Sequence, residues 1–201
     1  MNKNIINVMF VELLYQTSLP EYEHLKNYFC NVVKEVEQSA KGVRAVKWHC
    51  NTFSTLANKN YNLLHDKKFT ELKEDILHHT VKFAKEYGVK DTNGVFLDAW
   101  INNSKPGDHQ EYHIHPTSHF SIIYYVDVPE NSGNTIFKGN EESNMFPIPC
   151  KEPTQAGSNH WIYEPKNNDL VIFRSNVYHM VDTNRSSDNR ITISANISFP
   201  Y

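Results

Sequence analysis

The sequence predicts an α+β chain in which helices precede an antiparallel β-sandwich or barrel. Two segments of the first half carry apolar residues at steps of three and four, which is the period of an amphipathic helix. The second half consists of short runs rich in β-branched and aromatic residues, separated by Pro, Gly, Asn and Ser. Because the strands follow the helices and do not alternate with them, the pattern favours an α+β fold over a βαβ fold.

Both helices have recognisable ends. The first is expected from Leu19 to Ala40, with Pro20 at its start and Gly42 just beyond its end. The second is expected from about Lys68 to Tyr87, where Gly88 provides a natural stop. Each helix has an apolar stripe on one side, so each is expected to pack on the β core.

The strands are expected from the apolar runs of the second half. They cover Phe96–Ile101, His113–His115, Ser121–Val128, Asn134–Phe137, Asp169–Phe173 and Arg190–Phe199. The chain has 201 residues, 39% of them hydrophobic, and contains no repeat or linker that would divide it. Residues 1–201 are therefore expected to form one domain, with 1–94 as mainly helical support and 95–201 as the β core that carries the functional site.

Charge and composition exclude several classes of partner. The chain has 20 Lys and Arg against 23 Asp and Glu, so it has no basic field that would attract nucleic acid. It has no apolar run near the roughly 20 residues of a membrane helix, and its start does not resemble a signal peptide. Three cysteines without CxxC spacing are typical of a reducing compartment. We expect a cytoplasmic protein without membrane or nucleic-acid partners, and the sequence leaves its oligomeric state open.

The histidines indicate a metal site. The chain has 11 His, and four of them lie between His109 and His119. On a strand, His113 and His115 would point to the same face, and His179 follows the apolar strand DLVIF at an expected strand end or turn. Three such ligands can form a facial triad that leaves the other metal positions open. The alternative is that these are surface histidines of a His-rich chain without a function.

Arg190 opens the strand RITISANIS, in which Arg190, Thr192 and Ser194 share one face. An arginine that points into a β core is costly unless a carboxylate meets it, and its planar guanidinium matches a carboxylate with two hydrogen bonds. The hydroxyl of Thr192 can contact the same anion. The alternative is an arginine at the mouth of the core that pairs with Asp182 or Asp188.

Three strings of the second half resemble a known enzyme core. GDHQEYHIHPTSHFSIIYYVDVPENSGNTIF, NNDLVIF and YHMVDTNRSSDNRITISANIS are similar to the double-stranded β-helix (jelly-roll, cupin-like) core of the Fe(II)- and 2-oxoglutarate-dependent oxygenases. They look most like a branch, with many members from phage and marine bacteria, that carries HxHPxSxxSGxYY and PxxxxHxVxxNxSxxxRxSxxxN segments. The resemblance reaches back to Trp48 and implies N-terminal helices packed on one sheet of this core.

The resemblance implies that His113 and His179 bind iron. Most of these oxygenases have a carboxylate two residues after the first histidine, whereas this chain has His115 there. A neutral imidazole makes the site one unit more positive than the usual set of two histidines and one carboxylate. Glu111 could supply a carboxylate instead, but the branch that the chain resembles has histidine at the position of His115. We therefore expect His113, His115 and His179 as the metal ligands.

The resemblance also implies a 2-oxoglutarate site. Arg190 matches the arginine that holds the distal carboxylate of this cosubstrate, and Tyr125 matches a tyrosine that hydrogen-bonds the same carboxylate. Thr192 and Ser121 are included as further cosubstrate contacts. Together with the three histidines, Arg190 is expected to be required for catalysis.

The resulting expectation is an Fe(II)- and 2-oxoglutarate-dependent dioxygenase that uses O2, with ascorbate as a candidate reductant. It would couple the oxidative decarboxylation of 2-oxoglutarate to succinate with hydroxylation of an unidentified small molecule or peptide, in a host cytoplasm if a phage encodes it. The loop Asn140–Tyr163 is expected to act as a substrate lid. Two alternatives remain open: a cupin-like metalloprotein with another dioxygenase or isomerase activity, which has no use for Arg190, and a non-catalytic binding or structural module.

Overall fold

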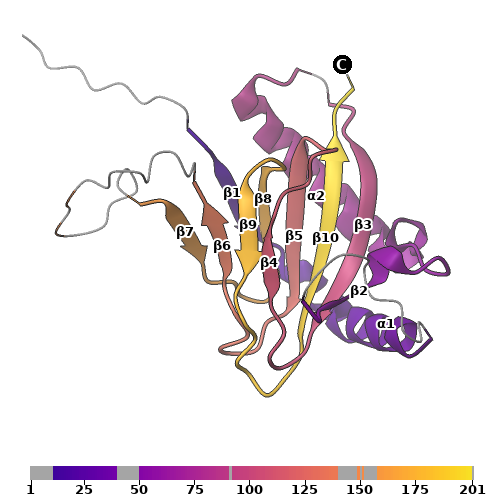
Figure 1. Ribbon diagram of the computed structural model, residues 1–201. Coiled ribbons are helices and arrows are strands. Elements are labelled where there is room, and N and C mark those ends of the chain that lie inside the picture. Colours follow the sequence, from indigo (N-terminus) through magenta and orange to yellow (C-terminus); the bar gives the residue numbers. More distant parts are fainter. Residues whose placement is uncertain are drawn as a thin grey trace, which may run out of the picture.

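The strands of the second half form two antiparallel sheets that face each other, as the computed structural model shows (Figure 1). The structure describes residues 11–39, 50–90, 92–139, 149, 151 and 158–200. The strands are β1 (Leu14–Ser18), β2 (Phe53–Ser54), β3 (Val95–Ser104), β4 (Gln110–His113), β5 (Phe120–Asp127), β6 (Thr135–Lys138), β7 (His160–Tyr163), β8 (Asp169–Arg174), β9 (Tyr178–Val181) and β10 (Arg190–Ser198). This two-sheet arrangement is the double-stranded β-helix that the sequence predicts.

The larger sheet has six strands in the order β1-β8-β5-β10-β3-β2. Strand β10 lies at its centre and pairs antiparallel with β3 on one side and with β5 on the other. A β-bulge falls between Asn196 and Ile197 in the pairing of β10 with β3. Strand β1 comes from the N-terminal part of the chain and pairs with β8, so residues before 95 also contribute to this sheet.

The smaller sheet has four strands in the order β4-β9-β6-β7. Its register places His113 of β4 directly opposite His179 of β9, and Phe137 of β6 lies opposite His179 on the other side. Two histidines that are far apart in the sequence therefore meet because of strand pairing. A second apolar cluster, which includes Tyr125, Phe137 and Phe173, fills part of the space between the sheets.

The helices cover one face of the larger sheet (Figure 1). A 3-10 helix (Pro20–Leu25) leads into α1 (Lys26–Ser39), and α2 (Thr70–Ala84) lies between the 3-10 helices Lys67–Phe69 and Lys85–Tyr87; two more 3-10 helices span Thr55–Ala57 and Leu63–His65. Their apolar side chains and those of the sheet form the main core, and the fully buried residues Phe29, Phe69 and Ile76 belong to it. This layer supports the sheet from the side opposite the histidines.

The helical predictions are confirmed over the described residues, while Ala40 and Gly42, the expected end of the first helix, lie outside them. The segment from Pro20 to Ser39 is helical, as expected, although its first turn is a 3-10 helix. The second helical segment ends at Gly88, whose φ of 79° lies in the left-handed region that glycine adopts at low cost.

Five of the six predicted strands are present, whereas the predicted strand His113–His115 shares only His113 with β4. Strand β4 ends at His113, so His115 lies beyond it. Pro116 follows His115 and has no N–H for a ladder, and the N–H of His115 donates to the carbonyl of Ser175. His179, expected at a strand end or turn, lies within β9. That strand is too short for periodicity to reveal it, and β1, β2 and β7 were missed for the same reason.

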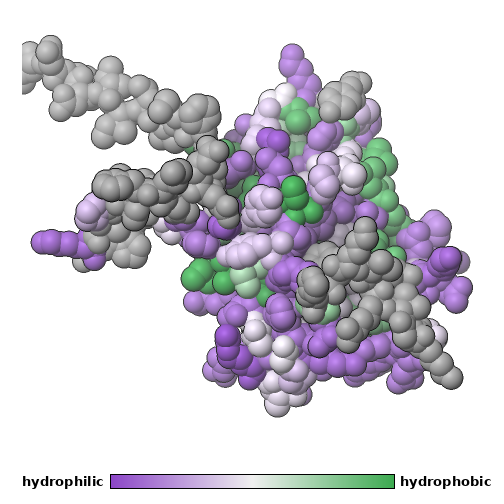
Figure 2. All heavy atoms as spheres, in the orientation of Figure 1, coloured by the Kyte–Doolittle hydropathy of each residue, from purple (hydrophilic) through white to green (hydrophobic). Residues whose placement is uncertain are grey.

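The surface carries apolar side chains in small separate patches. Figure 2 shows hydrophilic residues over most of the face on view, with hydrophobic ones at its right edge over β3. Val95 and Leu97 of this strand are exposed. Among the described residues, no helix is both long and apolar enough to cross a membrane.

Candidate active site

A cavity between the two sheets contains the side chains that the sequence analysis singled out. Its walls come from β3, β4, β5, β8, β9 and β10 and from the segment after β4. The lining residues are Trp100, Asn102, Gln110, His113, His115, Ser121, Ile122, Ile123, Phe173, His179, Val181, Arg190, Thr192 and Ser194. The face of β10 predicted to carry Arg190, Thr192 and Ser194 is thus the face that lines the cavity.

The three predicted histidine ligands converge in this cavity. One ring nitrogen from each of His113, His115 and His179 lies within 4.8 Å of the others. The ring centroids of His113 and His179 are 4.1 Å apart, and that of His115 is 5.1 Å from the first and 5.3 Å from the second. His115 reaches the group although it is not on a strand. Among the residues that the structure describes, the convergent group consists of these three, without Glu111.

Backbone carbonyls orient two of the rings. Nδ1 of His113 lies 2.8 Å from the carbonyl oxygen of Glu111, and Nδ1 of His179 lies 3.0 Å from that of Val177. A carbonyl only accepts, so each Nδ1 carries the proton and donates it. The Nε2 lone pair of each ring is then available as a ligand.

Burial keeps these imidazoles neutral. Desolvation lowers the pKa of His113, and it lowers the pKa of His179 well below the usual value. Burial and the neighbouring His113 lower the pKa of His115 to about 4. Neutral imidazoles in a convergent group are the ligand set that suits a divalent transition metal such as Fe(II), so the donor set fits an iron ion.

Arg190 is a buried charge that has no carboxylate partner among the residues that the structure describes. Its side chain is 3% exposed, its Nη2 donates to the Thr135 hydroxyl at 3.4 Å, and its guanidinium lies 5.4 Å from the ring centroid of Tyr125. Its Nε is buried and has no hydrogen-bond partner. A buried, incompletely paired guanidinium is costly on its own, and a dianion such as 2-oxoglutarate fits the donors that it leaves open.

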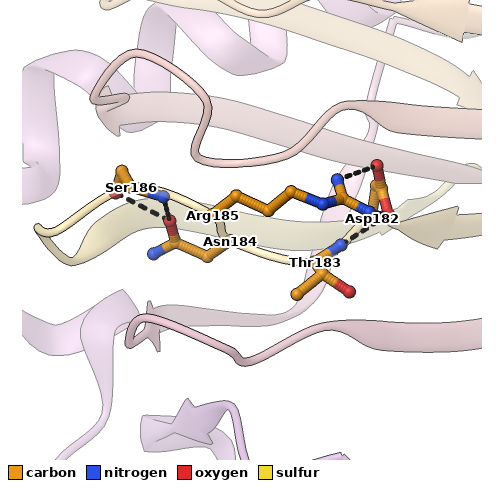
Figure 3. Close-up of polar contacts among 5 residues, drawn as sticks. All are labelled: Asp182, Thr183, Asn184, Arg185 and Ser186. Atoms are coloured by element: carbon orange, nitrogen blue, oxygen red, sulfur yellow. Dashed lines mark hydrogen bonds and ion pairs between the residues drawn. The ribbon is translucent and has the colours of Figure 1, made fainter.

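The alternative partners of Arg190 are engaged elsewhere. Asp182 pairs with Arg185 at 2.8 Å within the turn after β9, as Figure 3 shows. Asp188 accepts from the hydroxyl of Ser187 in the same turn. Arg190 instead faces the interior beside Tyr125, whose hydroxyl is 2.8 Å from that of Thr135.

Comparison with known proteins agrees with this geometry. Residues 98–196 match a family model described as "Putative 2OG-Fe(II) oxygenase". Residues 98–196 are therefore an oxygenase domain of this family. A search among curated proteins found no match to the oxygenase.

Solved structures share the fold of the oxygenase at low sequence identity. A prolyl-4-hydroxylase from Pseudomonas putida matches with a TM-score of 0.62 and 12% identity over 94% of this chain and 93% of that one. The viral collagen prolyl hydroxylase of Paramecium Bursaria Chlorella virus-1, in complex with 2-oxoglutarate, gives 0.57 and 11% over 92% and 94%. An α-ketoglutarate-dependent carbocyclase from nogalamycin biosynthesis gives 0.59 and 13% over 92% and 78%.

The oxygenase is therefore an oxidoreductase that uses Fe(II), 2-oxoglutarate and O2. The remaining predicted contacts lie near the cavity. Thr192 lies 3.4 Å from the amide nitrogen of Asn102, while Ser121 is hydrogen-bonded to Ser175 and Asn196. Ser121 thus contacts groups other than Arg190 and Tyr125.

Sequence reasoning missed several residues of the oxygenase site. Thr135 contacts both Tyr125 and Arg190, and Asn102 donates to Ser194 at 3.0 Å. Alternation along β3 and β10 could have found Asn102, because it lies opposite Thr192 in the register. Thr135 has no such signal, since it reaches Arg190 from the other sheet. The predicted lid, residues 140–163, lies mostly outside the described residues.

Proposed function

We propose that this oxygenase hydroxylates a small-molecule or peptide substrate at an iron held by His113, His115 and His179. Arg190 binds the distal carboxylate of 2-oxoglutarate, with Tyr125 and Thr135 beside it and Thr192 on the same face of β10. The observation that carries the proposal is that convergent neutral imidazoles and an unsatisfied buried guanidinium line one cavity.

The protein residues in this mechanism bind, orient and exclude water. When bound, ferrous iron and 2-oxoglutarate supply the oxidising chemistry: O2 and 2-oxoglutarate yield succinate, CO2 and one oxygen atom for the substrate. The carbonyls of Glu111 and Val177 hold the protons of His113 and His179 at Nδ1, so the other nitrogens can serve as ligands. Apolar walls such as Ile123 and Phe173 keep bulk water from the site.

The structural relatives support 2-oxoglutarate-dependent oxidation as the reaction type, but they do not indicate a particular substrate. Their names include prolyl hydroxylases, a carbocyclase and an epimerase, so this fold serves hydroxylation and other oxidations. We propose hydroxylation because it is the simplest reaction in which the oxygen atom of O2 that does not enter succinate is transferred to the substrate.

The test is succinate release from 2-oxoglutarate with Fe(II) and ascorbate across a panel of small molecules and peptides, under 18O2. We expect substrate-dependent succinate formation and one labelled oxygen atom in the product. His179→Ala and Arg190→Ala should lose both. His65→Ala changes an exposed histidine that does not line the cavity, and it should keep both. A product that contains no 18O would show that the enzyme catalyses an oxidation other than hydroxylation. Equal turnover in all three variants would overturn the assignment of the site.

A further inference from the structure

The three histidines of the proposed metal site are held in different ways. His113 and His179 are on strands, and each donates from Nδ1 to the carbonyl two residues before it. His115 lies in the segment beyond β4, where its N–H donates to the carbonyl of Ser175 at 2.8 Å. This bond fixes the backbone of His115, whereas the orientation of the ring depends on what surrounds it.

An aromatic side chain of the larger sheet borders the ring of His115. The indole of Trp100 on β3 lies at an angle of 14° to the imidazole, with the ring centroids 5.8 Å apart. Such a near-parallel pair at this separation is a favourable arrangement of two aromatic rings. Trp100 is 6% exposed and lines the cavity, as does Ser194, which lies opposite it on β10. The roles assigned above do not involve this tryptophan.

Ring contacts continue from His115 to the other side of the larger sheet. The imidazole of His115 is nearly parallel to that of His179, with planes at 18° and centroids 5.3 Å apart. His179 meets Phe173 of β8 edge to face, with centroids 4.6 Å apart. In the larger sheet, β3 and β8 lie on either side of the central pair β5 and β10. A tilt of the His115 ring would therefore break its parallel contact with Trp100 or with His179.

The plane of an imidazole decides where it can bind a metal. The lone pair of a neutral ring nitrogen lies in the plane of the ring, so the ion must lie close to that plane. A carboxylate, the group that most of the resembled oxygenases have at this position, offers two oxygen atoms with several lone-pair directions and is less demanding. A histidine in its place needs a contact that fixes the plane of its ring.

We propose that Trp100 is the positioning residue of the third metal ligand. Its indole fixes the plane of the His115 imidazole, and this plane directs a ring nitrogen to the point at which His113 and His179 also converge. The inference rests on the proposed metal site. It explains how a histidine beyond the end of β4 takes the place of a carboxylate ligand.

The experiment measures metal binding without turnover. Calorimetry gives the Mn(II) and Co(II) affinities of the purified full chain, and visible absorption reports the ligand geometry of the Co(II) form. Trp100→Leu keeps an apolar side chain but removes the flat face, so it should weaken both affinities by about 3- to 10-fold and change the Co(II) spectrum. Trp100→Phe keeps a flat ring, so it should stay within about 2-fold of the unmodified protein and retain its Co(II) bands.

The matched control is Ile101→Ala. Ile101 follows Trp100 on β3, is fully buried and belongs to the main core on the opposite face of the sheet. Its truncation removes apolar packing from the same strand, and it is not among the residues that line the cavity. This variant should melt at a lower temperature but keep the metal affinities and the Co(II) spectrum of the unmodified protein.

The proposed metal site and the role of Trp100 fail in different ways. If His115→Ala binds Mn(II) and Co(II) like the unmodified protein, the metal site is wrong and the inference falls with it. If His115→Ala loses affinity while Trp100→Leu binds both metals like Ile101→Ala, the metal site stands and Trp100 does not position its ligand. An equal loss in Trp100→Phe and Trp100→Leu would also overturn the inference, because the flat ring would then have no effect. If Trp100→Leu does not fold, Trp100→Met, which also lacks a flat face, decides between the same outcomes.

Discussion

Arg190 carries a buried charge that 2-oxoglutarate would pair with under the proposed function. Its guanidinium is buried, burial lowers its pKa, and its Nε lacks a partner. Replacing a buried, poorly paired charge by an apolar side chain of similar volume is often neutral or stabilising by about 1 to 4 kcal/mol. Arg190, which the proposed function requires, is therefore expected to reduce the stability of the protein when no 2-oxoglutarate is bound.

Arg190→Met tests whether Arg190 is needed for 2-oxoglutarate binding but reduces stability in the absence of ligand. We expect the variant without ligands to melt at a temperature equal to or above that of the unmodified protein, and to bind no 2-oxoglutarate. Scanning calorimetry gives the first quantity, and titration of 2-oxoglutarate into the Mn(II)-loaded protein gives the second. A clear loss of stability together with retained binding would contradict the role assigned to Arg190.

The turn after β9 is a structural element and not a part of the metal site. The buried Asn184 donates from Nδ2 to the carbonyls of Ser104 and Asp188. Its Oδ1 accepts from the hydroxyl of Ser186 (Figure 3). Its own backbone bonds those of Gly107 and Asp108. This turn therefore ties the end of β3, the segment before β4 and the start of β10 together.

Asn184→Ala should accordingly reduce stability. The substitution leaves two carbonyl oxygens without their amide donor, which costs about 1 to 3 kcal/mol. Urea unfolding followed by circular dichroism measures the change. Arg185→Ala, which removes only the exposed ion pair with Asp182, should leave the midpoint unchanged. An equal effect of both substitutions would mean that the amide of Asn184 does not hold the turn.

Gly133 fixes the approach of the turn between β5 and β6 to β9. Its φ is 94°, and a Cβ at this position would clash with the carbonyl oxygen of Asp182. Gly88 also has a positive φ, 79°, but a Cβ there would meet nothing within 4 Å. An alanine at Gly88 would therefore add backbone strain alone, whereas an alanine at Gly133 would add backbone strain and a steric clash.

Gly88→Ala should cost only the strain of a left-handed alanine, on the order of 1 kcal/mol. Gly133→Ala should cost distinctly more, because the backbone of β9 must move away, and it should also weaken Mn(II) binding through His179. Urea unfolding and calorimetry of the two variants side by side measure both effects. Equal stabilities would show that the turn can shift without cost.

At the scale of the whole molecule, ligands that bind only the folded state should stabilise it. Mn(II) at 100 times its Kd would add about 2.7 kcal/mol to the free energy of unfolding. For a chain of this length that corresponds to a rise in Tm of about 5 to 10 °C. Differential scanning calorimetry with and without Mn(II), and after chelation, measures it.

Two variants distinguish the stabilisation by Mn(II) from the stabilisation by 2-oxoglutarate. His179→Ala should lose the response to Mn(II), whereas Arg190→Met should keep it and lose only the further rise with 2-oxoglutarate. A metal-independent Tm in the unmodified protein would contradict the proposed site.

The sequence predicted the elements whose signal is local. The steps of three and four predicted both helices, and the β-branched runs predicted five of the strands, because side-chain periodicity follows from backbone geometry alone. The same alternation placed Arg190, Thr192 and Ser194 on one face, and the cavity confirms that face. In each of these cases the prediction depends only on residues within a single helix or strand.

The structure was needed wherever two distant segments meet. Strand β9 has four residues and exists because β4 and β6 pair with it on either side. His115 was expected on the same strand as His113, yet it reaches the cavity from beyond that strand, through a backbone bond to Ser175. No local pattern encodes either result, since both depend on hydrogen bonds between segments far apart in the chain.

By itself, the sequence determined the α+β order of elements, the three histidines and the arginine, and through its motifs the oxygenase family. Only the tertiary structure decided that the imidazoles converge, that Arg190 lies buried with no carboxylate partner in the described part of the chain, and that Asp98, Asn196 and Ser121 lie side by side on three strands. The reason is physical: residue type and spacing set what a strand presents on each face, whereas strand register sets what that face meets.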